Sequence, residues 1–124
     1  MILCDTDILI EFFKKNETIV ATLRDIGQDR LAVSHVTVAE LYFGALNKAE
    51  LARIRRDLAM LHAYPVSAGI SQRFLWLMGT YSLSHKLSLP DALIAATALE
   101  NDLTLFTLNW KDFRFIPGLQ LHGT

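Results

Sequence analysis

The sequence has few of the residues and segments that staple a protein or anchor it in a membrane. Its single cysteine, Cys4, excludes an internal disulfide, and one cysteine does not make a metal site. No segment approaches the roughly 20 consecutive apolar residues of a membrane span. The N-terminus lacks the basic start and small-residue cleavage site of a signal peptide. We therefore expect a cytoplasmic protein with no membrane association.

Repeats, low-complexity tracts and Pro/Gly-rich linkers are also missing. The chain has 124 residues, of which 52% are hydrophobic. This is enough for one compact domain with a sizeable core and too little for two. We therefore expect a single domain over residues 1–124.

Short apolar runs alternate with helical patterns along this domain. The expected strands are Met1–Cys4, Leu31–Val33, Tyr64–Val66 and Leu103–Phe106, with a weaker fifth at Leu119–Leu121. The expected helices are Ile8–Lys15, Glu17–Ile26, Val38–Leu46, Glu50–His62, Ser71–His85 and Asp91–Glu100. This alternation favours an α/β fold, a three-layer α/β/α sandwich around a parallel sheet of four to five strands.

Three acids stand out because they adjoin segments that are otherwise apolar. Asp5 directly follows the first expected strand, Glu40 lies in the nearly uncharged segment 36–43, and Asp91 begins an uncharged helix. An ionised carboxylate among apolar neighbours is costly unless it meets a cation or strong donors. Ligands of parallel sheets bind beyond the carboxyl ends of the strands, where these acids are expected to converge. Their hard oxygen atoms suit Mg²⁺ or Mn²⁺.

Helix capping is an alternative explanation for some acids. Asp91 alone could cap the helix that it begins, and Asp7 stands where it would cap the helix expected from Ile8. Capping does not explain Glu40, because a cap does not require a glutamate inside a helix. Glu40 is therefore the most informative of the three.

Four sequence blocks span nearly the whole chain in a fixed order. They are LCDTDILI at 3–10, SHVTVAEL at 34–41, PDALIAATA at 90–98 and LFTLNWKDF at 105–113. Together they resemble the PIN domain and, within it, the VapC-type toxins of bacterial and archaeal toxin–antitoxin pairs. The resemblance implies a PIN-like fold and a metal-dependent endoribonuclease that cuts RNA.

Carried over by position, the resemblance makes Asp5, Glu40 and Asp91 the catalytic acids that bind Mg²⁺ or Mn²⁺. Family members often have a further acid near the end of the last core strand. Here the matching stretch offers two residues. Asn109 supplies an uncharged amide oxygen, whereas Asp112 lies three residues later and would reach the metal through water. The choice between the two stays open, and Asp112 is a candidate catalytic acid.

Three further residues are expected to support the site. Thr107 matches a hydroxyl position of the family, and Thr6 lies between the two N-terminal aspartates. Asp7 departs from the family pattern, in which asparagine or serine is more common at this position. Its carboxylate would either add charge next to Asp5 and tighten metal binding, or only cap the helix, which we favour.

The sequence favours attack by water over attack by a protein nucleophile. It offers no plausible Ser/His/Asp triad, and its one cysteine lies in an expected strand. A metal at the three acids would activate a water for in-line attack on phosphorus. The family resemblance implies 5′-phosphate and 3′-hydroxyl products, transfer or ribosomal RNA as substrate, a cognate antitoxin and a homodimer.

The formal net charge of −1 conceals an asymmetry. If the five acids named above face the site, 13 − 5 leaves 8 acids against 12 bases elsewhere, a balance of +4. Such a surface is compatible with a rim that binds RNA phosphates.

Two other functions compete with this interpretation. Asp5-Thr6-Asp7 after a strand also matches the nucleophile motif of haloacid-dehalogenase-type phosphatases, and Thr107 imitates their second motif. That fold needs a later lysine and paired aspartates, which are missing, and it gives Glu40 no purpose. The second alternative is a catalytically inactive PIN-like scaffold that binds RNA or a protein, which the uncertain fourth acid keeps open.

Overall fold

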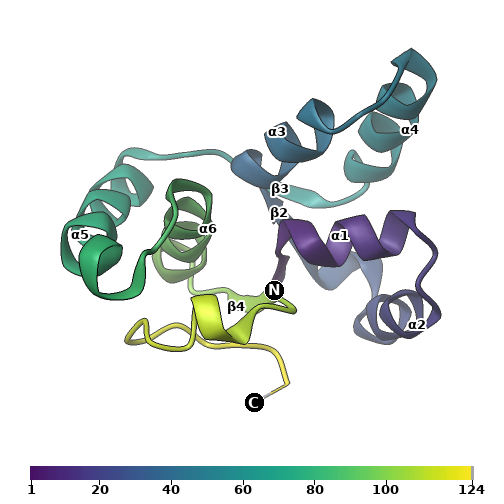
Figure 1. The fold of residues 1–124 in the computed structure, drawn as a ribbon. Helices are drawn as coiled ribbons and strands as arrows, with labels where there is room; N and C mark the ends of the chain where they lie inside the picture. Colours follow the sequence, from purple (N-terminus) through teal and green to yellow (C-terminus); the bar gives the residue numbers. More distant parts are fainter. Residues whose placement is uncertain (124) are drawn as a thin grey trace.

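A computed structural model describes residues 1–123, and its four strands form one parallel sheet in the order β3-β2-β1-β4 (Figure 1). The strands are β1 (Ile2–Cys4), β2 (Leu31–Ser34), β3 (His62–Tyr64) and β4 (Thr104–Phe106). The α-helices are α1 (Thr6–Phe13), α2 (Glu17–Ile26), α3 (His35–Phe43), α4 (Lys48–Leu58), α5 (Ala68–His85) and α6 (Leu89–Glu100). Two 3₁₀ helices, η1 (Gln28–Arg30) and η2 (Trp110–Asp112), complete the elements of this part of the chain. The predicted α/β fold with a parallel sheet is confirmed.

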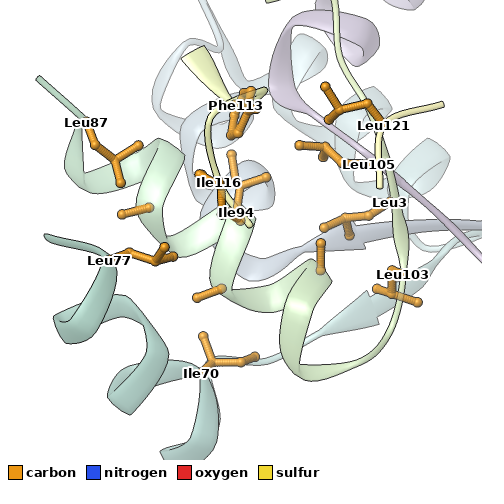
Figure 2. Close-up of a cluster of buried hydrophobic side chains, with 14 of the residues drawn as sticks. Leu3, Ile70, Leu77, Leu87, Ile94, Leu103, Leu105, Phe113, Ile116 and Leu121 are labelled. Atoms are coloured by element: carbon orange, nitrogen blue, oxygen red, sulfur yellow. The ribbon is translucent and has the colours of Figure 1, made fainter. Parts of the chain in front are cut away.

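The strands bury a different core on each face of the sheet, because successive side chains point to opposite faces. Leu3, Ala32 and Leu105 pack with α5 and α6, and Figure 2 shows Leu3 and Leu105 on one side of Ile94 of α6 and Leu77 of α5 on the other. The neighbouring strand residues Cys4, Val33 and Phe106 pack instead with buried residues of α1, α2, α3 and α4. This division confirms the predicted three layers, in which the sheet lies between two groups of helices.

The helices α1, α3, α4, α5 and α6 begin earlier than predicted because residues before the predicted starts cap them. Asp5 is the N-cap of α1, where its Oδ1 accepts a hydrogen bond of 2.8 Å from the backbone N–H of Thr6. The prediction that Asp7 caps this helix is therefore wrong. Ser88 caps α6, where its hydroxyl accepts a bond of 3.2 Å from the N–H of Asp91. Asp91 thus lies within the first turn and does not cap the helix.

The region before α5 is the least accurately predicted. The helix expected to reach His62 ends at Leu58, and β3 ends at Tyr64 instead of extending over Tyr64–Val66. The strand pairs with β2 in the register Ala32↔His62. Its pairing stops before Pro65, which has no backbone N–H to donate to a sheet.

The expected fifth strand, Leu119–Leu121, is reduced to one bridge. Leu121 pairs with Leu105 in parallel, and the N–H of Leu105 donates to the carbonyl of Gln120 at 2.8 Å. The N–H of His122 donates back to the carbonyl of Leu105, also at 2.8 Å. This segment covers the β4 edge of the sheet. Within residues 1–123, no helix has both the length and the apolar character needed to cross a membrane.

Candidate active site

Asp5 lies at the carboxyl end of the central strand β1. Its backbone N–H donates to the carbonyl of Phe106 at 2.9 Å, which extends the β1–β4 pairing by one residue. The residue is only 5% exposed, and both carboxylate oxygens accept hydrogen bonds. Oδ1 accepts from the N–H of Thr6, and Oδ2 accepts from the hydroxyl of Thr107 at 2.7 Å. The strand end and the two donors together fix the position of this side chain.

Asp7 connects the first turn of α1 with the loop after β4. Its Oδ2 accepts from the N–H of Leu108 at 3.1 Å and from the side-chain amide of Asn109 at 3.2 Å, with the Thr107 hydroxyl at 3.5 Å. Its other oxygen, Oδ1, is buried and has no hydrogen-bond partner. The structure therefore places Asp7 beside Asp5, with one carboxylate oxygen free to interact with a further group.

Glu40 reaches the same end of the sheet from α3. The hydroxyl of Thr6 donates to Glu40 Oε1 at 2.7 Å, so Thr6 contacts both Asp5 and Glu40. The Thr6 hydroxyl also lies 3.0 Å from that of Thr37, which in turn lies 3.2 Å from that of Ser34. Sequence reasoning missed Ser34 and Thr37. The available signal was two uncharged polar residues just before Glu40 in an otherwise apolar segment.

Electrostatics link Asp91 and Asp112 to this group. Burial raises the pKa of Asp91, and a hydrogen bond with Ser88 opposes the rise. The negative charges of Asp112, Glu40 and Asp7 raise this pKa further. The five predicted acids therefore lie close enough together for their charges to interact. Asn109 differs from these acids, because its side-chain amide donates a hydrogen bond to Asp7.

The pKa of Asp5 is strongly shifted. Burial, followed by the charge of Asp7, raises its pKa to about 7, although hydrogen bonds from Thr107 and Thr6 oppose the shift. Burial also raises the pKa of the Cys4 thiol to about 12, and the charge of Asp5 adds to this rise. The thiol therefore stays protonated and is a poor nucleophile. The thiol environment therefore gives no support to Cys4 as a nucleophile.

The donors at this site fit a hard divalent cation. In residues 1–123, no three His, Cys, Asp or Glu side chains form a ready-made metal cage. Mg²⁺ does not need one, since it usually keeps several waters and binds one or two carboxylates together with substrate phosphate. The buried, unpartnered Oδ1 of Asp7 and the raised pKa of Asp5 are the features that a cation would relieve. Asp5, Glu40 and Asp91 would hold it, with Asp7 alongside.

The raised pKa of Asp5 predicts that the metal-free protein loses stability as the pH rises. An unfolded aspartate has a pKa of about 3.9, so between about pH 4 and pH 7 the folded state retains a proton that the unfolded state releases. Stability from this proton is complete below the unfolded pKa and is lost as the pH rises through the folded pKa. Urea unfolding in EDTA should show a loss on the order of 1–4 kcal/mol over this range.

The control for this measurement is Asp5→Asn, which removes the titrating group and should flatten the pH dependence. Equal slopes for the two proteins would contradict the assignment. Saturating Mg²⁺ should also reduce the slope in the wild type, because a bound cation favours the ionised carboxylate.

Comparison with known proteins identifies the family. The PIN domain model matches residues 2–118. Ribonuclease VapC10 of Mycobacterium tuberculosis is 38% identical over 125 residues, which cover 97% of this chain and 91% of that protein.

Solved structures agree with this match and confirm the predicted PIN-like fold. A toxin–antitoxin complex from Klebsiella pneumoniae has a chain with a TM-score of 0.83 and 35% identity, over 96% of this chain and 95% of that one. VapBC2 from Rickettsia felis, bound to a DNA fragment from its promoter, gives a TM-score of 0.84 and 25% identity, over 98% and 97% of the two chains. The chain therefore belongs to the PIN-domain family.

Proposed function

We propose that residues 1–124 act as one PIN domain that hydrolyses RNA as a Mg²⁺- or Mn²⁺-dependent endoribonuclease, the toxin of a toxin–antitoxin pair. The observation that carries the proposal is the convergence of Asp5, Asp7, Glu40 and Asp91, although burial and like charge penalise it. Such a convergence of carboxylates is typical of a functional site. The likeness to a protein named ribonuclease VapC10 supports RNA as the substrate, with transfer or ribosomal RNA as the expected class.

The residues of the chain bind and orient the reacting groups. A divalent cation, when bound, would supply charge stabilisation and promote deprotonation of water. Asp5 is held by Thr6 and Thr107 with both carboxylate oxygens fixed, and the Glu40 carboxylate is held by the Thr6 hydroxyl. In the overall step, the water oxygen bonds to phosphorus, the bond from phosphorus to the 3′-oxygen breaks, and the leaving oxygen takes up a proton. The products are a 5′-phosphate and a 3′-hydroxyl.

Asp112, and not Asn109, is our choice for the fourth acidic position. The charge of Asp112 acts directly on the pKa of Asp91, whereas the Asn109 amide donates to Asp7. The N–H of Asn109 also donates to the Thr107 hydroxyl at 3.1 Å. Asn109 therefore shapes the loop that holds Asp7 and Thr107, and Asp112 contributes charge.

The family match favours this function over the phosphatase alternative. A haloacid-dehalogenase-type enzyme gives no role to Glu40, which the structure joins to Asp5 through Thr6. The PIN domain model also spans most of the chain. The inactive scaffold is the remaining alternative, and the cleavage experiment below distinguishes it.

A cognate antitoxin and a second copy of the chain are the proposed protein partners, in the cytoplasm. The similarity to chains of toxin–antitoxin complexes supports the antitoxin. For the free protein, we expect light scattering to give twice the 14.0 kDa mass of one chain. A mass of 14.0 kDa at all concentrations would contradict the homodimer.

The proposed chemistry predicts that Asp5→Asn abolishes RNA cleavage while the fold remains intact. The substitution keeps the shape of the side chain and removes its charge, which the cation requires. Purified protein is incubated with total cellular RNA and Mg²⁺ or Mn²⁺, and the cut ends are mapped. Loss on the order of 100-fold or more is expected, and EDTA should have the same effect on the wild type.

The matched control is Asp25→Asn, at an exposed aspartate of α2, which should cleave like the wild type. Full activity of metal-replete Asp5→Asn would refute the assignment. A wild-type protein that binds RNA without cutting it would support the inactive scaffold.

A second pair of variants tests which of Asp112 and Asn109 occupies the fourth acidic position. We expect Asp112→Asn to lower the cleavage rate about 10-fold or more, because charge near Asp91 is lost. Asn109→Asp adds a like charge opposite Asp7 and should destabilise the loop without replacing Asp112. Single-turnover rates at saturating Mn²⁺ provide the measurement. A normal rate for Asp112→Asn would exclude this residue from the site.

A further inference from the structure

A chain of three hydroxyl groups leads from the end of β2 to the carboxylate of Glu40. Ser34 and Thr37 are 2% and 0% exposed, so their hydroxyl groups cannot rely on bulk solvent for partners. The Oγ atoms of Ser34 and Thr37 lie 3.2 Å apart, and those of Thr37 and Thr6 lie 3.0 Å apart. Thr6 Oγ1 lies 2.7 Å from Glu40 Oε1. The chain thus crosses from β2 through α3 to α1 and returns to α3.

The number of available hydroxyl protons determines which group donates in each of these hydrogen bonds. An ionised carboxylate only accepts, so the single hydroxyl proton of Thr6 is donated to Glu40. The contact between Thr6 and Thr37 then needs the proton of Thr37, and that between Thr37 and Ser34 needs the proton of Ser34. Every proton therefore points towards Glu40.

The contact made by Thr37 differs from that of other helical threonines in this chain. Thr22, Thr80 and Thr97 each donate to the backbone carbonyl four residues earlier, at 2.7 to 2.9 Å. Thr37 contacts the side chain of Thr6 in a different helix. Helix capping does not require this contact, because the Ser34 oxygen caps α3 by accepting from the N–H of Thr37 at 3.2 Å.

We propose that Thr37, supported by Ser34, is a positioning residue that orients the Glu40 carboxylate through Thr6. The inference rests on the proposed function, since it assigns Glu40 to the cation. The Thr6 donor occupies Oε1, so Oε2 is the oxygen that we assign to the cation. Thr37 fixes the Thr6 hydroxyl in the rotamer that makes this contact. The group touching the cation is Glu40, and Thr37 acts only through Thr6.

The test replaces the hydroxyl of Thr37 without changing its shape. Thr37→Val should weaken Mn²⁺ binding, measured by electron paramagnetic resonance, on the order of 10-fold. Thr37→Ser restores the hydroxyl and should recover most of the affinity. Thr97→Val is the matched control, because it removes a buried helical hydroxyl that donates within its own helix. Mn²⁺ affinity unchanged in Thr37→Val relative to Thr97→Val would overturn the inference.

A double-variant cycle tests whether Thr37 acts on Glu40 through Thr6. Thr6→Val removes the donor to Glu40 directly, so adding Thr37→Val should cause no further loss of Mn²⁺ affinity. Additive losses would show that Thr37 acts by a separate route and would overturn the inference.

A second readout needs neither metal nor activity. NMR of metal-free protein should show the Glu40 side chain in one rotamer in the wild type and Thr97→Val, and averaged between rotamers in Thr37→Val. A Glu40 that stays fixed in Thr37→Val would overturn the positioning role. If the wild type cleaves no RNA but Glu40 is averaged only without the Thr37 hydroxyl, the proposed function fails and the positioning stands.

Discussion

The mutual repulsion of carboxylates at the carboxyl edge of the sheet is the constraint to which the rest of the site responds. Parallel strands all end at this edge, so residues far apart in sequence meet there. The contact between Thr107 and Asp5 spans 102 positions. Burial and the charges of Asp7 and Asp91 all disfavour ionised Asp5. The cores on both faces of the sheet hold the backbone in place against this repulsion. The two apolar cores therefore keep the acids together although their charges repel one another.

Neutral hydrogen-bond donors, and not cationic side chains, contact these carboxylates. Thr6 and Thr107 hydroxyls and the N–H groups of Thr6 and Leu108 contact the acids. Among residues 1–123, the ion pairs are Arg56–Asp57 and Arg73–Glu100, and neither includes any of these acids. A hydroxyl or amide donates a hydrogen bond without cancelling the charge of its partner. The site therefore keeps its negative charge and its oxygen lone pairs for a cation, whereas an arginine here would compete with one.

The helices and most strands could be predicted because periodicity and turn residues encode them locally. The bounds of α2, Glu17–Ile26, are predicted without error, since Asn16 caps the helix and Gly27 ends it. Errors occur where the sequence offers two candidate caps, Asp5 and Asp7 at the start of α1 and Ser88 and Asp91 at the start of α6. The edge strand β3 has the weakest local pattern, and its position depends on pairing with β2.

The acids of the site could also be predicted, because a charged residue within an apolar segment can be recognised from the sequence alone. Their supporting hydroxyls are less conspicuous. Thr37 and Thr6 are 31 positions apart, and nothing in the segment around Thr37 distinguishes a hydroxyl that contacts α1 from one that bonds within its own helix. Such a contact depends on how α1 packs on α3, which no local pattern specifies.

Asp7 shows what a change of one residue type does at such a site. Its Oδ2 accepts from Leu108 and Asn109, and an asparagine oxygen, more typical of the family position, would accept the same bonds. The difference lies at the other terminal atom. Asparagine would place an NH₂ donor there, among carboxylates that accept, whereas Asp7 places a buried oxygen without a partner. The loop is held in either case. Aspartate makes the cluster more negative by one charge, so the site of this chain depends more strongly on a cation than its backbone geometry alone requires.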